Sequence, residues 1–172
     1  MIEAMPRMNR RCYSLALTAG FTLIEVMVVL SVLAILALIA LPTFTDKIIR
    51  DQIAEALPLA NVAKPPVEAA WRVGQPLPAD NAAAGLPAAD QIVNTVVSAL
   101  TIQDGVILIT FGNRAHSKLK GKILSLRPAG VPGARVVPVT WLCGKAPPPS
   151  PMEAQGDNQT TVPTALLPVR CR

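Results

Sequence analysis

The sequence predicts an α+β protein in which a long N-terminal helix packs on a four-stranded antiparallel sheet. Two observations support this class. An apolar run from Phe21 to Thr45 continues as a helical pattern to Ala63. The second half of the chain instead carries short β-type runs separated by turn signals, with no sign of parallel crossovers or internal repeats. We expect the C-terminal half of the long helix to cover one face of the sheet and so close the core.

The apolar run reads FTLIEVMVVLSVLAILALIALPTFT and contains a single charged residue, Glu25. With a rise of about 1.5 Å per residue, a helix over residues 21–41 is as long as the hydrocarbon core of a bilayer is thick, so we expect it to span a membrane. A charge in such a helix costs roughly 2.5–3.5 kcal/mol on insertion scales and usually marks a functional partner. The alternative is that Glu25 lies near the interface and extends its carboxylate into water.

A basic cluster of Arg7, Arg10 and Arg11 precedes the run, and Gly20 stands immediately before it. In an ordinary secretory signal the small residue follows the apolar region, whereas here it comes first. The weakly apolar stretch 15–19 leaves conventional signal cleavage open as an alternative. Because the arginines precede the span, the positive-inside rule places the N-terminus in the cytoplasm and the C-terminal part outside.

The string GFTLIE at residues 20–25, followed by the apolar helix, resembles the prepilin processing motif of the type IV pilin family. The resemblance extends from Gly20 to Arg172, because NAAAGLPAADQIV, DGVILITF, LKGKILSL, VTWLCG and ALLPVRCR follow the order seen in major type IVa pilins. It implies that a prepilin peptidase cuts between Gly20 and Phe21 and methylates the new N-terminal Phe21. It also implies the pilin fold, with a C-terminal disulfide loop.

The resemblance further implies a partner for Glu25. After cleavage Phe21 carries a free α-amino group, which in this family faces the corresponding Glu of a neighbouring subunit. Such a pair would set the register between subunits as well as contribute energy.

The hydropathy pattern and the resemblance to type IV pilins together divide the chain into consecutive parts. The four main parts are the leader 1–20, the transmembrane half of the helix 21–41, its periplasmic half 42–71 and the globular head 72–172. Within the head we expect an αβ-loop at 72–92, the antiparallel sheet at 93–142 and a disulfide-bounded loop at 143–171.

The periplasmic half of the helix should carry an apolar stripe on one face and, on the other, the pairs Asp46/Arg50 and Asp51/Glu55 at i,i+4 spacing. The stripe comprises Ile48, Ile49, Ile53, Ala56 and Leu59. Pro42 should kink or loosen the helix. Pro58 and the Lys64-Pro65-Pro66 cluster should interrupt it before Trp71. This cluster departs from the family pattern, in which the helix continues, and Lys47 departs too, since an aromatic is common there.

Four strands are expected after the loop, at 96–103, 106–111, 122–127 and 136–141. Asp104-Gly105 between the first two is a two-residue hairpin signal. Residues 128–133 should form the turn before the fourth strand, and a short helix should start at Pro87 in the preceding loop.

Cys143 and Cys171 remain as an even pair once Cys12 leaves with the leader. A disulfide between them would stabilise the head by roughly 3–4 kcal/mol on the loop-entropy model; a metal or free-thiol role is the alternative. The tail 144–172 is rich in proline and polar residues, so we expect it to be extended, exposed and dependent on the disulfide. In the family this region lies on the fibre surface, and we expect it to contact molecules or surfaces outside the cell.

Composition excludes several function classes. The formal charge of +5 falls to +3 without the leader, and the aromatic content of 3% argues against stacking platforms for single-stranded nucleic acid.

His116 is the single histidine and is expected to be a solvated loop residue. No catalytic triad order, metal-ligand spacing or phosphate-binding Gly loop is present, so we expect no enzyme, metal or cofactor. Asn158-Gln159-Thr160 matches the glycosylation acceptor pattern, which also arises by chance.

A basic run without intervening acids is the remaining candidate site, and it comprises Arg114, Lys118, Lys120, Lys122 and Arg127. Such a stripe attracts a phosphate backbone, and some type IV pilins bind DNA during uptake. The alternative is a solvated face on which lysines protect edge strands from aggregation.

The resemblance implies a subunit that is stored in the inner membrane and polymerised with copies of itself into an extracellular helical fibre. Adhesion, twitching motility or DNA uptake are the implied outputs. The implied partners are the prepilin peptidase, the assembly platform, the motor ATPases and DNA or a host surface. The alternatives are a minor pilin, a type II secretion pseudopilin, a DNA-receptor pilin and a different membrane-anchored binding domain. Major pseudopilins usually lack the disulfide loop, which counts against that alternative.

Overall fold

The computed structural model describes residues 20–172, apart from the side chains of residues 39–43. The basic cluster and Cys12 of the expected leader therefore lie outside the described residues. The chain forms two compact units that divide after Ala40.

Helix α1 (Leu23–Ala56) begins in the first unit and ends in the second. Thr22 caps its N-terminus, because the Thr22 Oγ1 accepts a hydrogen bond from the Glu25 backbone N–H at 3.3 Å. A Thr cap followed three residues later by Glu is the capping-box pattern. Pro42 does not end the helix, and the kink predicted there stays a prediction.

The first unit exposes its apolar side chains. Every described side chain from Phe21 to Leu38 is exposed. Among the described residues, no helix was found to be long and apolar enough to cross a bilayer.

The prediction that prolines interrupt the helix before Trp71 is confirmed. Beyond α1 come a 3-10 helix, η1 (Leu57–Val62), and a second helix, α2 (Lys64–Val73). Pro58 and Pro65 stand in the first turns of η1 and α2, where a missing N–H breaks no intrahelical hydrogen bond. The head therefore keeps a continuous helical layer despite the interruption.

The buried seam of this helical layer recurs every three or four residues and consists of Ile49, Ile53, Ala56, Ala60, Ala63, Val67 and Trp71. Two members of the predicted stripe lie outside it. Ile48 is 38% exposed and Leu59 is only half-buried. Both lie one position before a seam residue, so they project beside the contact with the sheet rather than into it.

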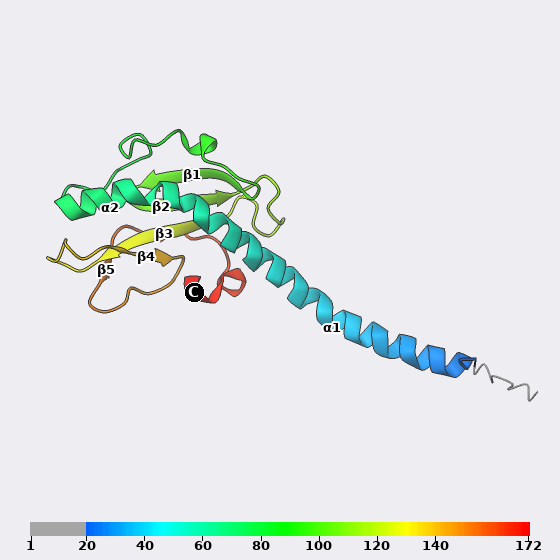
Figure 1. Cartoon of the computed structure of the whole chain (residues 1–172). Helices are drawn as coiled ribbons and strands as arrows, with labels where there is room; N and C mark the ends of the chain where they lie inside the picture. The colour runs from blue at the N-terminus through cyan, green and yellow to red at the C-terminus, as the bar shows by residue number, and fades with distance from the viewer. Residues whose placement is uncertain (1–19) are drawn as a thin grey trace, which may run out of the picture. The chain divides into compact units, whose positions relative to one another are not determined.

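The sheet is antiparallel, with the order β1-β2-β3-β4, and α2 lies across one face of it (Figure 1). The strands are β1 (Val97–Gln103), β2 (Val106–Phe111), β3 (Ile123–Gly130), β4 (Thr140–Cys143) and β5 (Glu153–Ala154). The predicted hairpin is confirmed, since Asp104 and Gly105 both have positive φ and join β1 to β2. β5 was not predicted and pairs with β3.

The predicted turn at residues 128–133 and the predicted fourth strand at 136–141 were wrong in position. β3 continues to Gly130, and β4 begins only at Thr140. The Pro128 carbonyl accepts a hydrogen bond from the Gln155 N–H at 2.8 Å. In a strand, the N–H and C=O of one residue point to the same edge, so the N–H that Pro128 lacks would also face the edge of β3 beside Gln155. On that edge the pairing of β2 with β3 has already stopped at Leu126. No hydrogen bond to β2 is therefore lost, and Pro128 is tolerated.

The core fills the space between the helical layer and the sheet. Ile53, Ala60 and Val67 from the helices belong to one buried cluster with Ile107, Ile109 and Leu124 from the sheet. Alternate residues of the same strands, including Leu108 and Ser125, are also buried. The tail packs against these alternate residues, since the Gln159 N–H donates to the Ser125 Oγ.

Short 3-10 helices complete the head: η2 (Ala89–Gln91), η3 (Thr164–Leu166) and η4 (Val169–Cys171). The short helix predicted to start at Pro87 is thus a single 3-10 turn that starts two residues later. α2 ends at Gly74 in the left-handed conformation, so the αβ-loop begins there rather than at Arg72.

Candidate functional site

The predicted processing and assembly residues lie together at the start of α1. Gly20, Phe21 and Glu25 are all exposed, and Phe21 retains 78% of its accessible surface. Within the described residues the Glu25 carboxylate has no ion pair or hydrogen bond. The first turn of the helix therefore presents an unpaired negative charge beside a large apolar side chain. The capping role of Thr22 was not predicted, although the spacing of Thr22 and Glu25 carries its signal.

The surface that follows is apolar on all sides of the helix. Its large exposed members are Leu23, Ile24, Val26, Met27, Val28, Val29, Leu30, Val32, Leu33, Ile35, Leu36 and Leu38. Contiguous exposed apolar surface of this extent marks a region that another apolar body covers. Its chemistry suits lipid chains or similar helices, and it offers no group for catalysis.

The predicted basic run does not form one surface. Arg114, Lys118, Lys120 and Lys122 are exposed in the loop that joins β2 to β3 (residues 112–122). Arg127 is separate, because it is half-buried on β3 and its Nη2 donates to the Ala146 carbonyl at 3.4 Å. Hereafter the four exposed residues are called the basic loop cluster.

His116 is part of the structure of this loop rather than a solvated side chain. It is half-buried, and its Nδ1 accepts a hydrogen bond from the Lys118 N–H at 3.2 Å. Its own backbone N–H donates to the Gln52 Oε1 on α1 at 2.8 Å. His116 thus lies in a loop as predicted, but it is not fully solvated, because the loop folds back onto the helix, which the sequence does not reveal.

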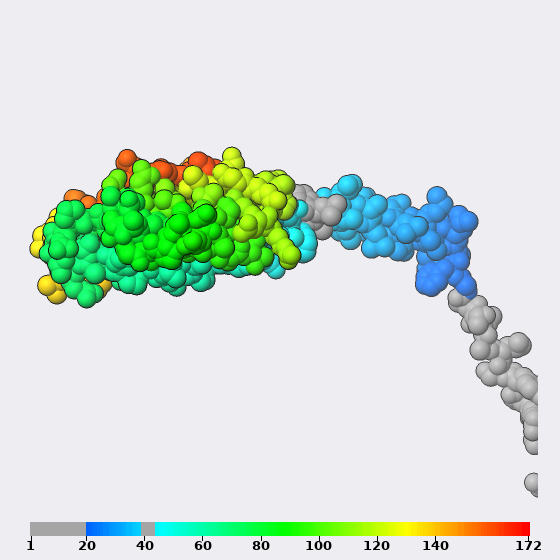
Figure 2. Space-filling model, turned by 90° about the horizontal axis from the view of Figure 1, so that it is seen from above, coloured from blue at the N-terminus to red at the C-terminus, as the bar shows by residue number. Residues whose placement is uncertain are grey.

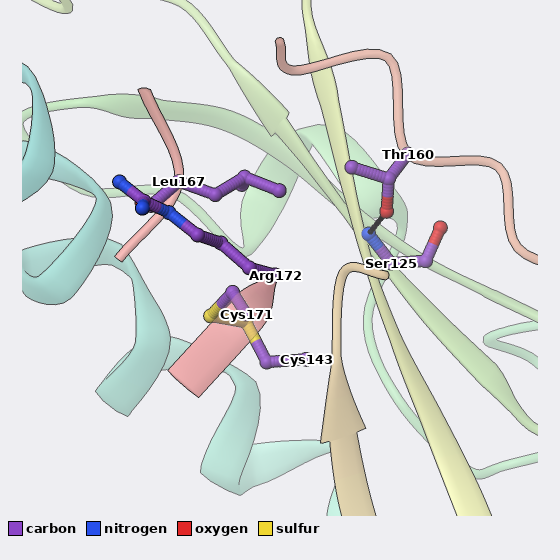
Figure 3. Close-up of a disulfide and its surroundings, with 6 residues drawn as sticks. All are labelled: Ser125, Cys143, Thr160, Leu167, Cys171 and Arg172. Atoms are coloured by element: carbon purple, nitrogen blue, oxygen red, sulfur yellow. Dashed lines mark hydrogen bonds between the residues drawn. A yellow bond between two sulfur atoms is a disulfide. The ribbon is translucent and has the colours of Figure 1, made fainter. Parts of the chain in front are cut away.

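The predicted disulfide between Cys143 and Cys171 is present (Figure 3), with the two Cα atoms 4.5 Å apart. It joins the end of β4 to η4, and Cys171 is fully buried. The Lys145 N–H donates to the Cys171 carbonyl at 3.0 Å, so the backbones are also bonded where the disulfide joins them.

The tail depends on more than this disulfide, contrary to expectation. The Thr160 Oγ1 accepts a hydrogen bond from the Ser125 N–H at 3.1 Å (Figure 3), and the Thr161 N–H donates to the Ile123 carbonyl at 2.9 Å. Three apolar residues also enter the core, namely Val162, Leu166 and Leu167. The proline segment 147–151 is exposed throughout, as predicted.

Comparison with known proteins places the chain in a family. Residues 50–172 match the family model for pilin, a bacterial filament protein, and residues 16–41 match the prokaryotic N-terminal methylation motif. The chain belongs to the pilin family. This pilin is similar to the type IV major pilin protein PilE of Neisseria gonorrhoeae, with 32% identity over 91% of this chain and 95% of that protein.

Two further relatives agree with this assignment. A fimbrial protein of Neisseria meningitidis serogroup B is 31% identical over 91% of this chain and 95% of its own length. The fimbrial protein EcpC of Eikenella corrodens is 39% identical over 72% of this chain and 80% of its own length.

Membership in the family settles the class of function. This pilin is a structural subunit of a pilus and not an enzyme. Pilins assemble with copies of themselves, and the N-terminal methylation motif makes the chain a substrate of a prepilin peptidase. Within the part of the chain that the structure describes, no group of three or more His, Cys, Asp or Glu could hold a metal ion.

Proposed function

We propose that this pilin is the main subunit of a type IV pilus, stored in the inner membrane and polymerised into a surface fibre. The observation that carries the proposal is the exposed apolar surface between Phe21 and Leu38, which lies within residues 16–41, the stretch that matches the methylation motif. In storage, residues 21–41 lie in the bilayer with the N-terminus in the cytoplasm, and lipid covers this surface. In the fibre, the helices of neighbouring subunits cover it instead.

Exchange of one apolar environment for another explains why assembly needs machinery. Apolar surface gains little when it moves from lipid to neighbouring helices, since both remove it from water. Extraction from the bilayer therefore requires work, which cytoplasmic motor ATPases supply through an assembly platform. Because the exchange is nearly balanced, the same machinery can reverse it and return subunits to the membrane.

Glu25 acts in this scheme as the residue that selects register. The leader is cut between Gly20 and Phe21, and the methylated Phe21 amine of one subunit meets the Glu25 carboxylate of its neighbour. An uncompensated charge in an apolar bundle costs roughly 2.5–3.5 kcal/mol, so a packing that leaves Glu25 alone is disfavoured. The exposure of Glu25 and its lack of an ion pair within the described chain support this role.

The fibre serves attachment to surfaces, twitching motility or DNA uptake. For attachment, the exposed proline segment 147–151 in the disulfide-bounded loop is the part of the head that we propose contacts a host surface. Its backbone is already restricted by four prolines, so binding would cost it little conformational entropy.

Electron microscopy of fibres sheared from the cell surface, with mass spectrometry of their subunits, tests the proposal. We expect long fibres whose most abundant polypeptide begins at a methylated Phe21. A fibre that contains this chain only in trace amounts would instead assign it to the minor pilins. A chain found only in the membrane fraction, or in fibres with residues 1–20 still attached, would overturn the proposal.

A further inference from the structure

The basic loop cluster is the strongest charged feature of the head that assembly of the helices does not use. Arg114, Lys118, Lys120 and Lys122 stand within eleven consecutive residues, 112–122, which contain no acidic residue. All four side chains are exposed. Within the described part of the chain, none of their cationic groups has an ion pair or a hydrogen-bond acceptor. The exposed Asp51 and Glu55 of the nearby helix do not pair with them either.

The loop holds these cations in a defined arrangement. Ala115 and Leu119, which alternate with the cations, are buried at 4% and 0% exposure. The Arg114 N–H donates to the Thr95 carbonyl, and the Lys122 N–H donates to the Leu119 carbonyl, at 3.0 and 2.8 Å. The loop is therefore anchored from within while its charges point outward, so little backbone order remains to be lost when it binds a polyanion.

The loop also lies at the end of the head where the chain enters it. The His116 N–H binds Gln52 on α1, eleven residues after Leu41, the last residue of the proposed span. Along a helix that separation is about 16 Å. Figure 2 shows the loop, in yellow-green, at the same end of the head as the cyan residues 44–50 of α1.

We propose that the basic loop cluster binds the phosphate headgroups of anionic phospholipids on the outer face of the membrane in which the pilin is stored. The proposal rests on the storage of residues 21–41 in the bilayer. Lys and Arg close to an anionic membrane surface each raise affinity by about fivefold, and the attraction falls off within a Debye length of about 8 Å at physiological salt. The long side chains of Lys118 and Lys120 extend the reach of the loop toward such a surface.

Phospholipid is favoured over DNA as the polyanion for two reasons. A membrane anchor holds the loop at a high effective concentration relative to the lipid surface, so weak contacts suffice, whereas DNA must be captured from solution. Arg127, which would have lengthened the cluster into a stripe along a duplex, bonds to Ala146 instead.

Fluorescence quenching in vesicles tests the proposal on the full chain. A fluorophore is attached to the thiol introduced by Ser117→Cys, an exposed position in the loop, in a chain that also carries Cys12→Ser. The native Cys143 and Cys171 are blocked by their disulfide. The chain is reconstituted in phosphatidylcholine vesicles with and without about 30% phosphatidylglycerol, and the neutral quencher acrylamide reports the access of water to the loop.

The expected result is a quenching constant at least about twofold lower in the phosphatidylglycerol vesicles at low salt, with the difference lost near 0.5 M salt, where screening is strong. Lys118→Gln with Lys120→Gln should abolish the difference. Arg72→Gln with Arg170→Gln is the matched control, because it removes two exposed cations outside the loop. That control should retain the difference.

Three results would overturn the inference. Equal quenching in both kinds of vesicle, for a chain that floats with both, would show that the loop ignores anionic lipid. Quenching that falls only when duplex DNA is added, in a manner that depends on Lys118 and Lys120, would assign the cluster to DNA. A chain that fails to float with phosphatidylcholine vesicles would contradict membrane storage itself, and flotation separates this failure from the other two.

Discussion

The indole of Trp71 at the end of α2 lies directly on Gly130 at the end of β3. A Cβ at Gly130 would fall 2.1 Å from the ring atom Cζ2 of Trp71. The guanidinium of Arg135 lies over the ring, 5.0 Å from its centroid. The ring is thus confined between a strand and the loop that follows it, and this contact requires a residue without a side chain at position 130.

Gly130→Ala should therefore destabilise the head by about 1–3 kcal/mol, because the added methyl group overpacks a ring that cannot retreat. Chemical denaturation followed by circular dichroism measures the change. Trp71→Phe provides the matched test, since a smaller ring leaves room for the methyl group. The double variant should lose less than the sum of the two single losses. Strictly additive losses would contradict the contact.

Asn81 should prove essential for stability although it lies in a loop. It is buried, and its Oδ1 accepts from the Ile102 N–H at 2.6 Å while its Nδ2 donates to the Leu100 carbonyl at 2.9 Å. The side chain thus occupies the free edge of β1 in place of a neighbouring strand. The Nδ2 also donates to the Pro87 carbonyl at 3.1 Å, so Asn81→Ala leaves three backbone groups without these partners and should cost about 2–4 kcal/mol.

Hydrogen exchange distinguishes this role from a general loss of packing. The Ile102 amide should exchange faster in Asn81→Ala under conditions in which core amides of β2 remain protected. Asn158→Ala is the control, because Asn158 is exposed and makes one local hydrogen bond, to Thr160. If both substitutions change stability by less than about 0.5 kcal/mol, edge protection by Asn81 is refuted.

Removal of the disulfide should weaken the head without unfolding it. The variant Cys143→Ala with Cys171→Ala should lose about 2–4 kcal/mol, as loop entropy predicts. The sheet should persist, because Val162, Leu166 and Leu167 still anchor the tail in the core. Denaturation of the oxidised chain, the reduced chain and the variant measures this, and the last two should agree. An unfolded variant would show that the apolar anchors are insufficient.

Glu25 variants separate charge from helix capping. The cap joins the Thr22 Oγ1 to the backbone N–H of residue 25, so Glu25→Gln removes the charge and retains the cap, whereas Thr22→Ala removes the cap alone. We expect Glu25→Gln and Glu25→Ala chains to be inserted and cut normally. Their yield of sheared fibre should fall at least about tenfold, because in the proposed pairing the Phe21 amine then lacks its counter-charge.

Thr22→Ala should reduce the fibre yield much less, since a cap contributes about 1 kcal/mol. Quantitative immunoblotting of sheared fibres, with mass spectrometry of the cleaved N-terminus, measures both steps. Wild-type fibre yield from Glu25→Gln would refute the charge pair, and loss of cleavage would move the role of Glu25 to processing.

Local features were predictable and distant pairings were not. The Asp104-Gly105 hairpin was placed correctly because two consecutive residues determine its backbone conformation. The end of β3 was misplaced because Pro128 is usually read as a strand terminator. Its tolerance depends on where β2 stops and on Gln155, which is distant in the sequence. The division of the basic run had the same cause, since only the fold shows that Arg127 bonds to Ala146.

The sequence by itself determined the long apolar helix with its methylation motif, the proline interruptions of the helix and the pairing of two cysteines. Each of these is encoded by a few adjacent residues or by a count of one residue type. The tertiary structure decided how Asn81 closes the edge of β1, how the tail is bound to β3, and how the loop that carries four exposed cations is bonded through His116 to Gln52 on α1. Those outcomes depend on hydrogen bonds and apolar contacts between residues far apart in the chain, whose free energy is realised only when the layers pack.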